Sequence, residues 1–533
     1  MLLCHQTVIN LSLRCHLFFL FLLKFFDNYI DNNQEQNMKI SRLTLAVATI
    51  LGAGASSGAF AMDLYVDTKT KQIYAEPGRG RELMGSFEKV QDAPAKPAEI
   101  EAIREDLALK DNAIKALEEH AAADSAPESV NVKLDNKGLN FETKDKNFKF
   151  KLGGRIQADA NYSSTDNFVK DFGKKTQAPV EANDGTEFRR ARIDFTGTFY
   201  KDWNFKTQVD FADNAVAVKD LYMQYTGLDF MSITGGQQKQ NFSRELLESS
   251  NDLMFTERSL MNVLNAPVVD RAIGLNFQSE AKTGYTAALG IYGDTITPNK
   301  DPKDGKTLFT GDEGWGISGR TTFAPIEEKT KVVHLGVAGN YRAPNADGKV
   351  IDNEMHYVYE TDHMSNLNLI DTKVSGISNI KMLGLEAAGL YGPVSVGAEY
   401  TRQWVDRKDA GSNLEVDGWY ADAAWTITGE SRKYKQGKFY KLDPAKNFSL
   451  KNGGWGAFEL ATRYSAVDLD DGTFHGGEAS NVTVAANWYF NSNFRLMADY
   501  TRAFNFTNPA VKTAAGGDPD NNDTFTLRGQ LAY

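Results

Sequence analysis

The stretch Phe188–Phe211, FRRARIDFTGTFYKDWNFKTQVDF, begins with three arginines within four positions and then alternates between polar and apolar residues. Because successive side chains of a β-strand point to opposite faces, two sets of residues separate along its first half. One face carries Arg190, Arg192, Asp194, Thr196 and Thr198, and the other carries Ala191, Ile193, Phe195, Gly197 and Phe199. This strand therefore has one apolar, aromatic face and one charged, hydroxylated face.

Length and charge narrow the class of protein. A chain of 533 residues has room for several soluble domains or for one large barrel with a small extra module. The net charge of -11 argues against a nucleic-acid partner, because such proteins are usually basic. Both cysteines, Cys4 and Cys15, lie near the start, so the rest of the chain needs no disulfide framework.

The first sixty residues have the pattern of a secretory leader. Lys39 and Arg42 form a basic start, residues 43–53 are apolar, and Ala59-Phe60-Ala61 is a small-x-small cleavage site. We expect residues 38–61 to be a signal peptide and interpret residues 1–37 as a mis-called N-terminal extension; the alternative is a longer leader. No apolar run of membrane-helix length follows in the sequence.

A helix is predicted over residues 96–123, before a linker that contains Pro127. Its a/d seam consists of Ile100, Ile103, Leu107, Lys110, Ile114 and Leu117. Two interpretations stand: one amphipathic helix that packs on something else, or a short oligomerisation coiled coil. We expect residues 62–130 to form a periplasmic N-terminal segment and residues 131–533 to form a separate domain.

From residue 148 onward, alternating segments of about ten residues are separated by Gly, Asn and Asp-rich breaks. Sixteen strands are predicted, at 148–162, 187–199, 205–212, 219–226, 230–237, 271–280, 285–292, 314–324, 331–341, 381–391, 393–404, 416–428, 454–465, 480–490, 493–504 and 523–533. Short turns alternate with long polar connections, which is typical of outer-membrane barrels. The last strand ends on the aromatic Tyr533, which resembles the signal that such barrels present to the barrel assembly machinery. The sequence predicts an all-β fold, a sixteen-stranded antiparallel transmembrane barrel.

In such a barrel the apolar face of each strand contacts outer-membrane lipid and the polar face lines the lumen. Alternation places seven arginines inward: Arg190, Arg192, Arg320, Arg342, Arg463, Arg495 and Arg528. Arginine presents a planar fork of donors that matches oxyanions, and rows of positive charge in a pore favour anions. The alternative is that these arginines pair with inward acids such as Asp194, Glu459 and Asp499 and only brace the wall.

Six segments together resemble the phosphate- and polyphosphate-selective O/P porin family. In chain order they are FRRARIDFTGTFYKDWNFKTQVDF, DLYMQYTG, GGQQKQNFSRELLESSNDLMFTERSL, DGWYADAAWTITGESRKY, GAFELATRYSAVDLDDG and AANWYFNSNFRLMADY. The resemblance runs from about Phe148 to Tyr533 and implies a homotrimeric barrel in the outer membrane of a Gram-negative bacterium. It also implies passive uptake of phosphate or polyphosphate anions. A general or carboxylate-type porin, and a surface adhesin with an incidental pore, are the competing functions.

The resemblance also implies a third outer loop, residues 238–270, that folds into the lumen. The resemblance implies that the residues of the family's constriction are found here at the matching positions of the sequence. These are Arg155, Arg189, Arg190, Asp220, Ser249, Ser250 and Arg258. Alternation points Arg190 inward more securely than Arg189. The sequence departs from the family at one position. The family has a lysine just before the two serines, and this chain has none there. Arg244 stands near that place, and the nearest lysine is Lys239.

Two further features remain. Residues 431–451 hold six lysines, which form either an exit funnel at the periplasmic mouth or a solvated loop: Lys433, Lys435, Lys438, Lys441, Lys446 and Lys451. Histidines at 120, 334, 356, 363 and 475 lack metal-ligand spacing. We therefore predict no metal, no cofactor and no enzymatic activity.

Overall fold

The computed structural model describes residues 62–69, 73–87, 97–123, 130–136, 138–164, 168–171, 177–180, 182–279, 284–293, 314–344, 354–365, 367–408 and 411–533. The chain divides into two compact units between Ile114 and Lys115. The expected signal peptide and N-terminal extension lie outside the described residues. Among the described helices, none has both the length and the apolar character needed to cross a bilayer.

The first unit contains a small antiparallel sheet in the order β2-β1-β3. Its strands are β1 (Met62–Asp67), β2 (Ile73–Tyr74) and β3 (Arg81–Phe87). The guanidinium of Arg81 lies 3.5 Å from the centre of the Tyr74 ring, a cation–π contact. Helix α2 (Pro97–Ala123) covers the predicted helix and starts with proline, which suits the first helical position. Its assembly into a coiled coil stays a prediction.

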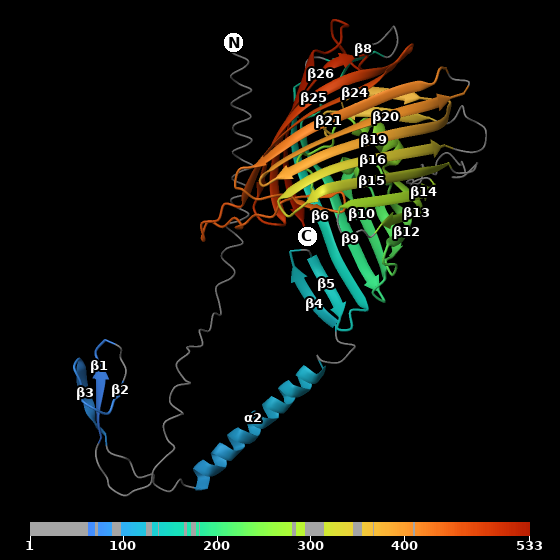
Figure 1. The fold of residues 1–533 in the computed structure, drawn as a ribbon. Coiled ribbons are helices and arrows are strands. Elements are labelled where there is room, and N and C mark those ends of the chain that lie inside the picture. The colour runs from blue at the N-terminus through green and yellow to red at the C-terminus, as the bar shows by residue number, and fades with distance from the viewer. Residues whose placement is uncertain are drawn as a thin grey trace, which may run out of the picture. The chain divides into compact units, whose positions relative to one another are not determined.

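The second unit is a closed antiparallel barrel of sixteen strands (Figure 1). The strands are β6 (Phe148–Ser163), β9 (Gly185–Phe199), β10 (Trp203–Asp210), β11 (Ala217–Tyr225), β12 (Met231–Lys239), β13 (Arg271–Ser279), β14 (Tyr285–Tyr292), β15 (Trp315–Glu327), β16 (Lys331–Ala343), β19 (Ile377–Tyr391), β20 (Val394–Arg407), β21 (Leu414–Thr426), β24 (Ala457–Asp471), β25 (Phe474–Tyr489), β26 (Phe494–Thr507) and β28 (Asn521–Ala532). Each pairs with the next along the chain, and β28 closes the ring on β6. All sixteen predicted segments are confirmed.

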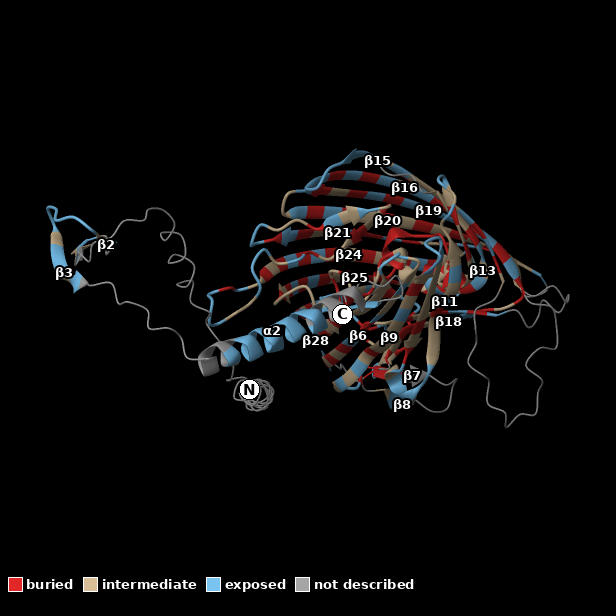
Figure 2. Ribbon diagram, turned by 90° about the horizontal axis from the view of Figure 1, so that it is seen from below, coloured by how far each residue is buried: buried red, intermediate tan, exposed pale blue. Residues whose placement is uncertain are grey.

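Alternation along the strands separates a lipid face from a lumen face. On β19, Leu383 and Leu385 are 37% and 47% exposed, while Met382 and Glu386, on either side of this pair, are buried. Figure 2 shows the resulting bands of buried and exposed residues along β15, β16 and β19. Exposed aromatic residues lie toward both ends of the strands: Tyr285, Tyr391, Trp425 and Phe494 at the short-turn end, and Phe188 and Trp315 at the other. Such girdles mark the two interfaces of a membrane barrel.

Two β-bulges change which side chains face the lumen. Between β6 and β9, Gln157 pairs with Arg190 and Ala158 pairs with Phe188, so Arg189 is an extra residue. Between β10 and β11, Gln208 pairs with Asp220 and Val209 with Val218, so Lys219 is extra. A bulge re-aims the side chain at the extra residue. Strict alternation favoured Arg190 over Arg189, but both arginines contact groups inside the lumen.

Loop 3, residues 240–270, crosses the interior of the barrel and contains α3 (Arg244–Leu247) and α4 (Asn262–Val269). Glu399 of β20 accepts hydrogen bonds from the backbone N–H groups of Arg244 and Glu245, at 2.9 and 2.8 Å. On other walls, Asp499 of β26 accepts from the Thr256 N–H at 2.7 Å, and the Gln157 amide of β6 donates to the Ser250 carbonyl at 3.1 Å. Loop 3 is therefore fastened across the lumen.

Two hairpins narrow the lumen from its ends. At the outer end, β17 (Met355–Glu360) pairs with β18 (Asn368–Val374), and this hairpin packs with α4 in one buried apolar cluster. At the short-turn end, β22 (Lys433–Lys435) pairs with β23 (Lys438–Tyr440). The N–H of Phe439 in β23 donates to Glu248 of loop 3 at 3.0 Å. The β22–β23 hairpin of the lysine-rich connection therefore packs against loop 3, while Lys433, Lys435, Lys446 and Lys451 are exposed.

The remaining elements are short. Strands β4 (Val130–Asp135) and β5 (Gly138–Thr143) form a hairpin that joins the sheet beside the start of β6. A three-stranded sheet combines β7 (Phe168–Asp171), β8 (Gln177–Val180) and β27 (Lys512–Thr513) among the outer loops. The 3-10 turn η1 (Ala212–Asn214) connects β10 to β11.

Candidate functional site

A polar cavity of about 510 Å³ lies between loop 3 and the walls formed by β6 and β9–β13. Ten basic side chains and four carboxylates line it among the described residues. The basic ones are Arg155, Arg189, Arg190, Arg192, Lys206, Lys219, Lys239, Arg258, Arg271 and Lys438; the acids are Asp210, Asp213, Asp220 and Asp270. The excess of positive charge gives this cavity the electrostatics of an anion site.

Eight of the predicted site residues line this cavity, although they come from four separate stretches of the chain. They are Arg155, Arg189, Arg190, Arg192, Asp220, Ser249, Ser250 and Arg258. The other five, Arg320, Arg342, Arg463, Arg495 and Arg528, do not line it and make different contacts.

Arg155 of β6 faces the two serines of loop 3. Its Nη1 donates to Ser250 Oγ at 2.7 Å and to Ser249 Oγ at 3.2 Å. Its carboxylate contact, to Asp194, is long at 3.9 Å. Because both hydroxyls also act as donors when they rotate, the group presents a guanidinium and two O–H donors to a bound oxyanion.

Arg189 and Arg190 share one acidic neighbour, Glu257 of loop 3. Arg189 donates to Glu257 at 2.9 and 3.2 Å, and Arg190 approaches it at 3.7 Å while donating to Gln157 at 2.9 Å. Burial alone would raise the pKa of Glu257, but Arg189, Arg190 and Arg528 hold that pKa well below its usual range. One carboxylate therefore serves several guanidiniums, and their positive charge is only partly compensated.

Arg258 stands out by the kind of acceptor it has. Its Nε and Nη2 donate to the carbonyl oxygens of Glu245 and Glu248, at 3.1 and 3.0 Å. Within the described part of the chain, no ion pair joins it to a carboxylate. A guanidinium has five N–H donors, so donors remain for a ligand. Backbone carbonyls thus fix its direction without cancelling its charge.

Lys239, rather than Arg244, lines the basic cavity. The Lys239 ammonium reaches from the end of β12 to the carbonyls of Leu246 and Glu248, and it lines the cavity. Arg244 is buried elsewhere, where it pairs with Glu248 at 3.0 Å and donates to the Tyr420 hydroxyl at 2.7 Å. Arg244 is therefore an anchor of loop 3.

Three of the inward arginines that do not line the basic cavity form close ion pairs with carboxylates. Arg320 binds Glu386 through two hydrogen bonds of 2.7 and 2.6 Å, and Arg528 binds Asp159 in the same bidentate way. Arg463 pairs with Glu245 of loop 3 at 3.2 Å.

Backbone carbonyls hold the other two: Arg495 donates to Leu253 at 2.7 Å and Arg342 to Gly293 at 2.6 Å. Pairing with acids, as the bracing alternative expects, therefore holds for Arg320, Arg463 and Arg528. Of the acids named for it, Glu459 pairs with Arg432 at 3.1 Å, and Asp499 accepts from Thr256.

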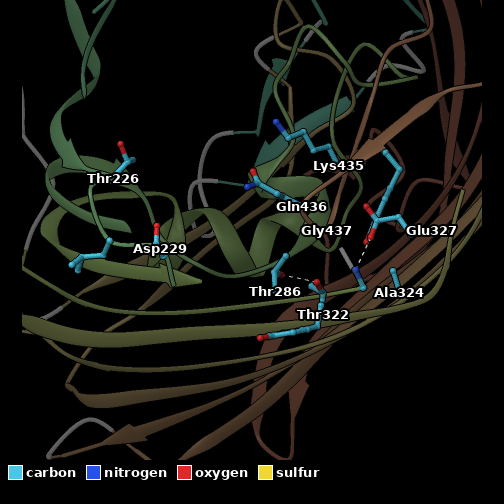
Figure 3. A pocket seen from close by; sticks show the side chains of 13 residues that line it. Thr226, Asp229, Thr286, Thr322, Ala324, Glu327, Lys435, Gln436 and Gly437 are labelled. Atoms are coloured by element: carbon cyan, nitrogen blue, oxygen red, sulfur yellow. Dashed lines mark hydrogen bonds between the residues drawn. The ribbon is translucent and has the colours of Figure 1, made fainter. Parts of the chain in front are cut away.

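A second cavity, of about 400 Å³, opens at the short-turn end (Figure 3). The tip of the β22–β23 hairpin forms one side through Lys435, Gln436 and Gly437, opposite Thr286, Thr322 and Glu327 of the wall. The next residue, Lys438, lines the basic cavity instead. The hairpin tip thus lies between the two cavities.

Sequence reasoning missed three of the basic cavity residues, Lys206, Lys219 and Arg271. It named Lys239 and Lys438 but did not assign them to this cavity. Alternation on β10 would have found Lys206, which shares the inward parity of Gln208 and Asp210. Lys219 required knowledge of its bulge, and Lys438 required the inward fold of its hairpin.

Apolar bands on the outside and a charged interior define this barrel as an outer-membrane porin, which is a channel. The chain belongs to the family of phosphate-selective porins O and P, whose model matches residues 150–533. It is 29% identical to Porin O of Pseudomonas aeruginosa over 428 residues, 74% of this chain and 91% of that protein. An uncharacterized protein of Caulobacter vibrioides is 28% identical over 410 residues, 76% of this chain and 78% of that protein.

Solved barrels are similar at lower identity. The outer-membrane channel DcaP of Acinetobacter baumannii matches with a TM-score of 0.44 and 13% identity, over 74% of this chain and 99% of that one. A trimer form of OmpT of Vibrio cholerae matches with a TM-score of 0.41 and 11% identity, over 72% of this chain and 99% of that one.

Proposed function

We propose that this phosphate-selective porin binds and passes its anions through the basic cavity beneath loop 3. The observation that carries the proposal is the excess of ten basic side chains over four carboxylates in one cavity. Within it, Arg258 and Arg155 are the principal ligands, because neither is matched by a close carboxylate. Ser249 and Ser250 add hydroxyl donors next to Arg155.

The mechanism is exchange of hydration for protein donors. An entering anion loses water molecules and gains N–H and O–H groups at several neighbouring positions. Conduction requires binding strong enough to draw the ion in and weak enough to release it. Glu257 and Asp220 moderate the site, since each pairs with basic residues of the cavity and lowers the local positive charge.

The route to the periplasm passes the β22–β23 hairpin. Lys438 takes the anion at the lower side of the basic cavity, and Lys435 faces it in the cavity of Figure 3. This supports the exit-funnel interpretation for these two lysines. Lys433 is instead paired with Asp443.

The proposal extends to assembly. We take the working unit to be a homotrimer in outer-membrane lipid, inserted by the barrel assembly machinery, as the resemblance to O/P porins implies. Trimers that survive mild SDS and dissociate on heating are the expected result for purified protein.

Ion selectivity in planar bilayers tests the proposal. The reversal potential in a chloride gradient should show anion preference, and phosphate should block chloride current in a saturable way. Arg502→Ala is the matched control, because the Arg502 side chain is 49% exposed on the face of β26 that points away from the lumen. Cation preference would refute the anion pathway. Absence of conductance would favour the adhesin alternative, and block by dicarboxylates but not by phosphate would favour a carboxylate-type porin.

A further inference from the structure

Three potential metal ligands meet near the outer mouth of the lumen. Glu187 comes from the start of β9, Asp213 from η1, and His363 from the turn between β17 and β18. One ligand atom of each lies within 4.8 Å of the other two. The three segments are far apart in the sequence, which explains why spacing gave no sign of a metal site.

The geometry suits a small divalent ion. His363 Nδ1 lies 2.8 Å from Glu187 Oε2. Two ligands of one tetrahedral zinc ion, each about 2.0–2.2 Å from the metal, are roughly 3.3 Å apart, so closing the set needs only small side-chain shifts. The His363 side chain is 37% exposed, which leaves the ligands reachable from outside. A mixed imidazole and carboxylate set favours Zn²⁺ over Mg²⁺ or Ca²⁺.

A second observation points to a missing cation. Glu187 Oε1 is buried and has no hydrogen-bond partner in the described structure. Beside His363, Asp362 is 3% exposed, and its Oδ2 also lacks a partner among described residues. A buried carboxylate oxygen without a partner is costly. An ion held by Glu187 would offset that cost.

We propose that Glu187, Asp213 and His363 bind a divalent transition-metal ion of the Zn²⁺ class, with water completing the shell. One of its ligands, Asp213, also lines the basic cavity. The site ties the barrel wall to the outer hairpin and lies two residues from Arg189, at the entrance of the basic cavity. The ion therefore adds positive charge there and restrains the hairpin. This consequence for conduction rests on the proposed function, whereas metal binding itself does not.

Calorimetric titration of chelator-treated, detergent-purified protein with ZnCl₂ tests the binding. We expect one saturable Zn²⁺ site per chain and none for Mg²⁺ at the same concentrations. His363→Ala and Asp213→Asn should each weaken Zn²⁺ binding at least tenfold. His356→Ala is the matched control, because His356 lies on the same hairpin and its imidazole pairs with Asp371, outside the proposed ligand set. Co²⁺ should give a visible absorption spectrum that His363→Ala abolishes.

Unchanged Zn²⁺ affinity in both variants, or no saturable binding by the parent protein, would overturn the site. Heat-modifiable mobility on SDS gels shows that each variant is folded, and Asp213→Asn keeps the test valid if one variant misfolds. Bilayer recordings with outer Zn²⁺ form a separate arm. If Zn²⁺ binds but a His363-dependent change in chloride current is absent, the coupling to conduction fails while the site stands.

Discussion

Replacement of Arg258 by alanine is the sharpest test of the anion site. The guanidinium is positioned by two backbone carbonyls, of Glu245 and Glu248, at 3.1 and 3.0 Å. Alanine therefore removes positive charge from the cavity without leaving a carboxylate unpaired. The main loss expected is the interaction with the anion, not the stability of the fold.

The magnitude follows from one charge-assisted hydrogen bond. Such a bond contributes about 1.5–3 kcal/mol. Because about 1.4 kcal/mol corresponds to a factor of ten, Arg258→Ala should weaken phosphate block of the chloride current roughly 10- to 150-fold. Arg258→Lys should recover only part of the affinity, since an ammonium restores the charge but not the planar fork. Single-channel titration with phosphate measures both.

The result that would refute this reasoning is unchanged phosphate block in Arg258→Ala together with a lowered thermal unfolding temperature. Arg258 would then serve only to hold loop 3. Arg502→Ala, on the outer surface, controls for a general effect of removing an arginine, and it should change neither quantity.

The remaining predictions concern neighbouring charges and the two units. Glu257→Gln should tighten phosphate block by up to about tenfold, because it releases Arg189 from its carboxylate. The neighbouring arginines lower the pKa of Glu257, so this carboxylate stays ionised from pH 8 to pH 5 and adds no pH dependence of its own to phosphate block. Because phosphate itself titrates in this range, Glu257→Gln is the reference: a rise in block on acidification that the parent protein shows and Glu257→Gln lacks would contradict the assignment. Arg320→Ala should destabilise the barrel by about 3–5 kcal/mol, because the buried Glu386 loses both guanidinium hydrogen bonds and keeps the contact with His334 Nε2 at 3.2 Å. The effect on block should be small; thermal unfolding and titration separate the two. Deletion of residues 62–125 should leave a heat-modifiable barrel, and loss of barrel assembly would show that the N-terminal segment is no accessory.

Strand positions were predictable because lipid on one side and lumen on the other impose a period of two. All sixteen segments were found from that period, with differences only at their ends. The inward direction of Arg320 and Arg528 was equally predictable. Periodicity does not reveal which carboxylate each inward arginine pairs with. Glu386 lies 66 residues from Arg320, and Asp159 lies 369 residues from Arg528.

The site was less predictable because bulges and in-folded loops break the period. Arg189 and Lys219 are extra residues in their ladders, and Lys438 reaches the cavity through a hairpin that enters the lumen. Alternation also does not give the height of a residue in the pore: the register pairs Arg528 with Asp159, on the outer side of Gln157. Only the resemblance identified Ser249 and Ser250, since their contact with Arg155 is made across the lumen.

Block of chloride current by phosphate in one purified channel tests the central claim most directly. If the basic cavity beneath loop 3 is the anion site, block should saturate with phosphate concentration and should be weakened in Arg258→Ala and Arg155→Ala but not in Arg502→Ala. A current that phosphate leaves unchanged, or equal block in all four proteins, would contradict it.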